Sequence, residues 1–172
     1  MGGPAHLTKR FFGSLVPFGP SPADAAWAER QLLDAEVPIW RSMSRADRRH
    51  ASGVARRVDA ALGDETTRPV IAAALLHDSG KVASGLGTFG RVGVTLLAAV
   101  IGRERVASWS ARDGIRGHAS RYIRHPEIGA AALRDADSDP LTTTWAAEHH
   151  LPPTAWTVPR RIGDILHAAD DD

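Results

Sequence analysis

The chain has 172 residues, with 21 Lys and Arg, 20 Asp and Glu, and a formal net charge of +1. It is 43% hydrophobic and 24% charged, as ordinary globular domains are, which excludes a mostly disordered chain. The lack of cysteine excludes disulfide frameworks, thiolate zinc sites and cysteine nucleophiles, and the near balance of charge argues against a nucleic-acid partner held by bulk charge.

Residues 1–20 are predicted to form an N-terminal arm, and residues 21–172 a single domain. Pro17 and Pro20 interrupt the short apolar run of the arm, and no small-residue cleavage site follows it. A secretory signal peptide is therefore not expected. Without a targeting signal, the default compartment is the cytoplasm.

Almost every segment after the arm is predicted to be helical. Ser21 is expected to cap a first helix that ends where Pro38 breaks the chain. Ser44 is expected to cap a second helix, and Gly63 to end it. These caps predict where the first two helices begin.

The middle of the chain is predicted to hold two apolar helices separated by a loop. Pro69 begins a helix expected to end near Gly80, and the glycine-rich residues 85–93 are expected to form a mobile loop. The longest apolar run, Val92 to Gly102, is shorter than the roughly 20 residues that span a bilayer. We therefore predict a buried core helix there and expect no membrane partner.

Four further helices are predicted over residues 116–124, 126–133, 139–150 and 159–169. No stretch of the sequence alternates apolar and polar residues between hairpin turns, as a half-buried strand would. The sequence therefore predicts an all-α, bundle-like domain.

Histidine and aspartate recur on the inward faces of these helices. Asp78 ends the apolar run VIAAALLH, where a charged carboxylate is costly to bury unless it is paired or binds a cation. Imidazoles and carboxylates that point inward from five segments would be costly to bury in an apolar core. That cost is removed if these side chains converge on a metal ion. Such ligands suit one or two divalent ions of Mn, Fe, Co, Ni or Zn. The candidate ligands are His50, His77, Asp78, His125, His149 and Asp170.

The order of these residues along the chain, and the short motifs around them, can be compared with those of known protein families. After His50 come the phrases LLHDSGK at 75–81, HPEIGAAAL at 125–133, EHH at 148–150 and LHAADDD at 166–172. Over residues 44–172 the chain therefore resembles the HD-domain superfamily of metal-dependent phosphohydrolases, in its HDIG-type branch. The resemblance implies an HD-domain helical bundle with a buried metal site.

The resemblance also implies roles for the individual ligands. It assigns one metal to His50, His77, Asp78 and Asp170, and a second to His125 and His149, with Asp78 bridging the two. His150 is less certain, because adjacent helical residues point about 100° apart and only one of the pair can follow the inward direction of Trp145. We therefore expect His149 to be the ligand, and His150 to contact substrate or support the site from outside the ligand set.

The activity that the resemblance implies is hydrolysis of a nucleotide or another small phosphorylated metabolite by attack of metal-activated hydroxide on phosphorus. Asp78 would orient the nucleophile, and Lys81 and Arg124 would contact phosphate. The chain carries LPP at 151–153 where relatives that cleave cyclic-di-GMP carry GYP, which disfavours that substrate.

Two alternatives use the same ligands differently. Some HD-domain relatives are non-haem diiron oxygenases, and the spacing does not separate these from hydrolases. A non-catalytic metal or ligand sensor, with residues 85–93 as its switch, is the third interpretation.

Because Asp170 lies two residues from the end of the sequence, we also expect the last turn to be more mobile without metal. The oligomeric state is left open.

Overall fold

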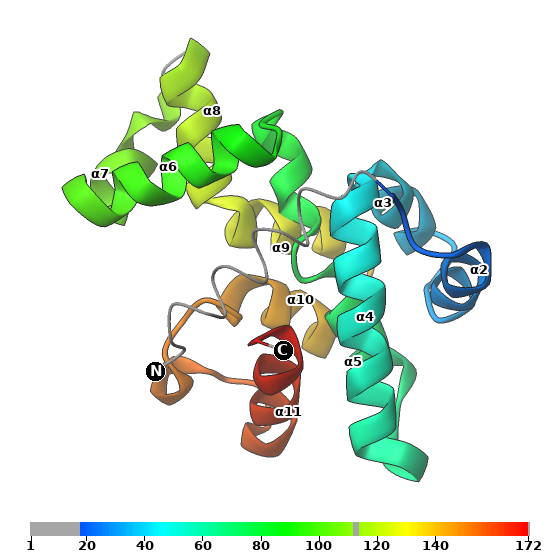
Figure 1. The fold of residues 1–172 in the computed structure, drawn as a ribbon. Coiled ribbons are helices and arrows are strands. Elements are labelled where there is room, and N and C mark those ends of the chain that lie inside the picture. The colour runs from blue at the N-terminus through cyan, green and yellow to red at the C-terminus, as the bar shows by residue number, and fades with distance from the viewer. Residues whose placement is uncertain (1–17, 112–113, 172) are drawn as a thin grey trace.

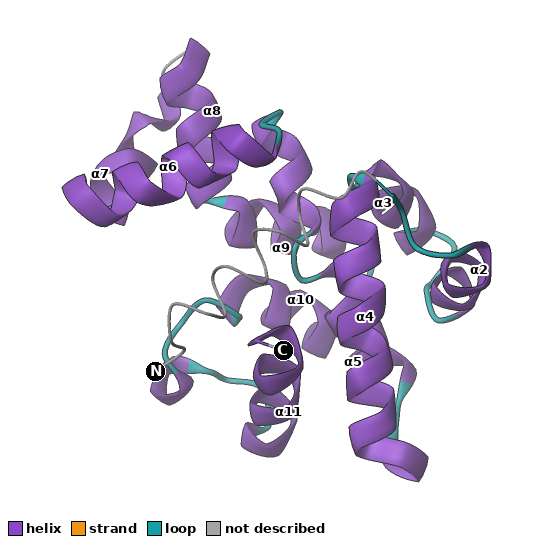
Figure 2. Ribbon diagram, in the orientation of Figure 1, coloured by secondary structure: helices purple, strands orange, loops and turns teal. Residues whose placement is uncertain are grey.

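The computed structural model describes residues 18–111 and 114–171, and its regular structure over these ranges is entirely helical (Figure 2). The all-α prediction is confirmed. The predicted N-terminal arm falls outside the described residues, except for its last three, of which Phe18 is exposed.

Serine caps begin two of the helices as the sequence predicts. α2 (Pro22–Arg30) follows Ser21, whose hydroxyl accepts the backbone N–H of Asp24 at 3.0 Å. α4 (Arg45–Leu62) follows Ser44, whose hydroxyl accepts the N–H of Asp47 at 3.1 Å. α4 ends at Gly63, whose φ of 54° suits a residue without a side chain.

The expectation that Pro38 breaks the chain is wrong. Residues 31–35 separate α2 from α3 (Glu36–Ser42), and Pro38 lies in the first turn of α3. The N–H groups of a first helical turn have no partner within the helix, so proline is tolerated there.

The main core surrounds a helix that is apolar from Pro69 to its end. In α5 (Arg68–Leu76) every residue from Val70 to Leu76 is buried. α4 and α10 (Pro140–Glu148) both pack on α5. α9 (His125–Asp135) packs on α10, and α11 (Arg160–Asp171) packs on α4, as Figure 1 allows the reader to follow. The remaining elements among the described residues are η1 (Gly63–Glu65), η2 (Ser79–Ser84), α6 (Thr88–Ile101), α7 (Arg103–Ala107), η3 (Ser108–Ala111), α8 (Gly114–Ile123) and η4 (Pro153–Ala155).

α6, α7 and α8 form a lobe with a small core of its own, and in Figure 1 they project together on the side away from α11. That core consists of Val94, Ala98, Val106, Ala119 and Ile123. The start of α6 is tied to the start of α4, because the Arg91 guanidinium lies 2.8 Å from both carboxylate oxygens of Asp47.

Three boundary and burial predictions for the middle of the chain are wrong. α5 ends at Leu76 rather than near Gly80, because η2 takes over at Ser79. The predicted loop over residues 85–93 is helical from Thr88 onward. The apolar run after it is mostly not buried, because in α6 only Val94 and Ala98 are buried in the small core of the lobe, with Ile101 partly buried against it.

Within residues 18–111 and 114–171, no single helix combines the length and the apolar composition needed to cross a bilayer.

Candidate metal centre

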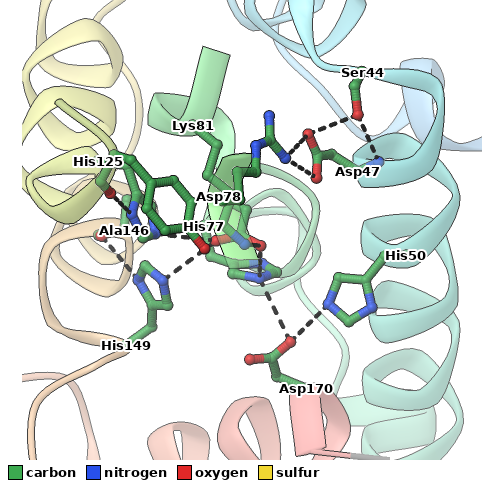
Figure 3. Close-up of polar contacts among 12 residues, drawn as sticks. Ser44, Asp47, His50, His77, Asp78, Lys81, His125, Ala146, His149 and Asp170 are labelled. Atoms are coloured by element: carbon green, nitrogen blue, oxygen red, sulfur yellow. Dashed lines mark hydrogen bonds and ion pairs between the residues drawn. The ribbon is translucent and has the colours of Figure 1, made fainter. Parts of the chain in front are cut away.

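The six predicted ligands meet in the middle of the main bundle, although they come from five separate elements (Figure 3). Each lies at or near the end of an element, except His50, which lies within α4. The others lie in the turn after α5 (His77 and Asp78), at the start of α9 (His125), after the end of α10 (His149) and in the last turn of α11 (Asp170).

Asp78 lies at the centre of the cluster and is buried. Its Oδ1 atom is 3.3 Å from Nε2 of His125 and 3.6 Å from Nε2 of His149. Its Oδ2 atom is 3.4 Å from Nε2 of His77 and contacts the Lys81 ammonium. One carboxylate therefore faces imidazoles on both sides.

The remaining two ligands join the cluster through His77. The Asp170 Oδ1 atom is 2.8 Å from Nε2 of His50 and 3.6 Å from Nε2 of His77. α11 thus brings a second carboxylate to the side of the cluster that α4 lines. All six residues of the predicted set are connected by these contacts.

Three of the imidazoles are held in one tautomer by the backbone. A carbonyl oxygen only accepts hydrogen bonds, so a ring nitrogen beside one must carry the proton. When such a ring is neutral, the opposite ring nitrogen keeps its lone pair, which is the form that binds a metal. In each case the Nδ1 atom donates to the carbonyl three residues earlier: His77 to Ala74 at 2.9 Å, His125 to Tyr122 at 2.7 Å and His149 to Ala146 at 3.0 Å.

The inward atoms of the cluster find no hydrogen-bond partner among the described residues. These are Nε2 of His77, His125 and His149, together with Oδ1 of Asp78, and all four are buried. Buried acceptors that face one another are costly unless a cation or a proton lies between them. The donor set therefore fits a metal ion.

The atoms form two overlapping donor groups, each within 4.8 Å: Asp78 with His125, His149 and His150, and Asp78 with His50 and His77. Each group could hold a metal ion, and Asp78 belongs to both. Imidazole and carboxylate ligands without thiolates suit several divalent transition metals equally, so the donor set does not select one.

No family model, curated protein or solved structure matches this chain. The resemblance to HD domains therefore depends on the residues and order given above. What the fold and the geometry establish is an all-α domain with a buried histidine and aspartate cluster that could hold a metal ion.

The charge state of the cluster follows from its neighbours. Burial opposes the ionisation of Asp78, but the Lys81 ammonium and the His77 imidazole outweigh it and hold the Asp78 pKa well below its usual range. Burial also opposes the charge on Lys81, but the Asp78 carboxylate outweighs it and raises the Lys81 pKa. Burial lowers the pKa of His149, which keeps that ring neutral and able to bind a cation.

His77 would make the binding of a metal at this cluster dependent on pH. Burial opposes its protonation, but the carboxylates of Asp78 and Asp170 outweigh it and raise the His77 pKa to about 9. Below that pH a metal must displace a proton, so we expect the apparent affinity for Mn²⁺ to rise about tenfold per pH unit from pH 7 toward 9 and then level off. Calorimetric titration in buffers of different ionisation enthalpy measures both the affinity and the released proton. An affinity that does not change over this range would contradict the assignment.

His150 reaches the cluster as well as His149. α10 ends at Glu148, and His149 follows as its capping residue, still in a helical conformation and donating its backbone N–H to the carbonyl oxygen of Trp145. The His150 ring centre is 4.1 Å from that of His149 and 5.1 Å from that of His125. His149 is buried and His150 is exposed, which places His150 on the solvent side of the donor group.

The two predicted phosphate contacts differ in position. Lys81 contacts Asp78 and is largely buried. Arg124 immediately precedes α9, is exposed, and its Nε atom lies 3.1 Å from Oε2 of Glu127. Arg124 is outside both donor groups, so of the two only Lys81 lies against the predicted metal ligands.

Two residues beside the centre were not anticipated. The Tyr122 ring stacks on His125 with ring centres 5.8 Å apart, and its position three residues before His125 was the available signal. Arg57 on α4 donates from Nε at 2.9 Å and from Nη2 at 2.7 Å to the carbonyl oxygen of Ala169, the residue before Asp170. Arg57 carries no sequence signal, because its role depends on how α4 packs on α11.

We expect Arg57→Met to weaken the affinity for Mn²⁺ about tenfold, as is usual when a residue that orients a ligand is lost. The change removes both hydrogen bonds that hold the last turn of α11 beside His50. Hydrogen exchange at residues 166–171, with and without Mn²⁺, also tests the expected mobility of this turn. Arg134→Met is the control, because Arg134 is exposed near the far end of α9. Equal affinity and equal protection in the two variants would rule out a role for Arg57.

Proposed function

We propose that this chain is a metal-dependent phosphohydrolase of the HD-domain type that acts on a nucleotide or another small phosphorylated metabolite. The observation that carries the proposal is the set of buried, inward-facing Nε2 and carboxylate atoms centred on Asp78. The cationic side chain of Lys81 beside that set supports a phosphorylated substrate.

Asp78, His125 and His149, with His150 on the solvent side, would hold one ion, and His50, His77, Asp78 and Asp170 would hold another. When bound, a divalent cation lowers the pKa of coordinated water toward about 7 and withdraws charge from phosphoryl oxygens.

The side chains of the chain itself have separable tasks in this proposal. Asp78 stays ionised, because Lys81 and His77 hold its pKa low, and so it can orient an attacking water. Lys81 stays protonated and offers a positive charge to a phosphate oxygen. His150 lies on the open side of the donor group, where a substrate would enter.

Lys81→Met tests the substrate class separately from metal binding. The change removes a charged hydrogen-bond donor, so we expect KM for the phosphorylated substrate to rise about 10- to 100-fold. The bound metal should be retained, because the change also removes a cation that competes for Asp78. Arg134→Met again serves as the control. If KM is unchanged and the metal is retained, Lys81 does not contact the phosphate.

The decisive experiment combines metal analysis with a screen of activity. The full chain is purified anaerobically, its metal content is measured, and phosphate release is assayed with nucleotides and sugar phosphates before and after chelation. The proposal expects phosphate release that chelation removes and Mn²⁺ restores.

A non-haem diiron oxygenase is the second candidate, and the two donor groups that share Asp78 favour it, because such ligands suit iron as well as manganese. Two irons per chain and oxygen consumption without phosphate release would support the oxygenase and overturn the hydrolase.

A further inference from the structure

One face of α6 presents large apolar side chains to solvent. Phe89, Leu96, Leu97 and Val100 are 75%, 64%, 38% and 82% exposed. Their sequence separations of 7, 8 and 11 from Phe89 place them on one side of a helix. The opposite side already packs on the core of the lobe through Val94 and Ala98. The exposed side is therefore an apolar face without a partner among the described residues, and such faces mark interaction sites.

The lobe that carries this face is strongly basic. From the start of α6 to the end of α8, residues 88–123 contain six arginines and two acidic residues, a net charge of +4, whereas the other 136 residues carry a net charge of −3. Arg103 and Arg105 lie exposed just beyond the end of α6, and Arg116 is exposed on α8. Although the net charge of the whole chain is close to zero, positive charge is therefore concentrated in the lobe and negative charge in the rest of the chain.

We propose that the exposed face of α6 docks on an anionic lipid bilayer. Leu96 and Val100 would enter the boundary between headgroups and acyl chains, and Arg103 and Arg105 would lie against lipid phosphates. This peripheral contact departs from the expectation of no membrane partner, which assumed that the apolar run was buried. It does not depend on the proposed enzymatic function.

The charge on the lobe distinguishes this partner from a second copy of the chain. A symmetric dimer through α6 would bring two lobes of net charge +4 together, and like charges across an interface are unfavourable. A bilayer with anionic lipid instead offers the opposite charge together with an apolar interior. Both features of the lobe are matched by that one partner.

The test is cosedimentation of the full chain with vesicles of phosphatidylcholine, alone or with 30% phosphatidylglycerol. We expect binding to the anionic vesicles and weakening as salt is raised. The double variant Leu96→Ser, Val100→Ser should bind at least tenfold more weakly. Arg103→Gln and Arg105→Gln should each weaken binding to the anionic vesicles about fivefold. Leu151→Ser is the control, because Leu151 is 44% exposed but lies after α10.

Thermal unfolding of every variant separates loss of binding from loss of the fold. The proposal is overturned if the folded wild-type chain binds neither kind of vesicle, or if the Leu96 and Val100 double variant binds as tightly as the wild type. It is also overturned if light scattering finds a dimer that the double variant abolishes while vesicles remain unbound, because the face would then belong to a second copy.

Discussion

Asp78→Ala is expected to lower the affinity for Mn²⁺ about a thousandfold and to abolish metal-dependent turnover. Asp78 belongs to both donor groups, and its two oxygens face His77 on one side and His125 on the other. The change also leaves the Lys81 ammonium without its carboxylate. Losing one partner of a buried ion pair destabilises the fold by about 3–5 kcal/mol, so the folding of the variant is measured as well. The expected thousandfold loss in metal affinity is a separate effect and corresponds to about 4 kcal/mol.

Metal content after dialysis and calorimetric titration with Mn²⁺ measure this effect. Asp164→Ala provides the matched control, because Asp164 is an exposed carboxylate on α11 that pairs with Arg160 at 2.9 Å. The control should bind metal as the wild type does. If the Asp78 variant remains folded and keeps its metal, the centre described here is not the metal site.

Gly80→Ala is expected to destabilise the domain by at least about 3 kcal/mol, as overpacking against immovable atoms does. A Cβ atom at Gly80 would lie 2.0 Å from the carbonyl oxygen of His125 and 2.6 Å from the backbone nitrogen of Gly129. Both are backbone atoms, so η2 and the start of α9 would have to separate. Because His125 begins α9, we expect the variant to lose metal affinity as well.

Gly93→Ala is the matched control for this prediction. Gly93 lies within α6, and a Cβ atom there would meet nothing within 4 Å. Alanine favours the helix over glycine by about 1 kcal/mol, so this variant should be as stable as the wild type or more stable. Urea unfolding of both variants measures the difference. Similar stabilities would show that η2 and α9 can move apart freely.

The parts of the fold that follow from local chemistry could be predicted from the sequence. Ser21 and Ser44 begin helices because their hydroxyls satisfy backbone N–H groups within the next turn. Gly63 ends α4 because its backbone conformation is one that side chains disfavour. The candidate ligands were found for a related reason, since polar residues on apolar faces are costly and therefore informative.

The parts that depend on the partner of a helix could not be predicted. The apolar run in α6 has the composition of a buried helix, but α7 and α8 cover only one side of it. The hydrogen bonds from Arg57 to α11 likewise depend on a contact with Ala169, which lies 112 positions later in the chain.

The backbone carbonyls that orient the imidazoles have an electrostatic consequence of their own. Ala74, Tyr122 and Ala146 lie in the last turns of α5, α8 and α10, so three helices direct their carboxyl ends at the centre. Each such end carries about half an elementary negative charge. Together with Asp78 and Asp170 they favour cationic charge at the centre beyond the Lys81 ammonium that Asp78 already pairs with. For the proposed phosphohydrolase, we therefore expect the phosphate ester to bind only after the metal.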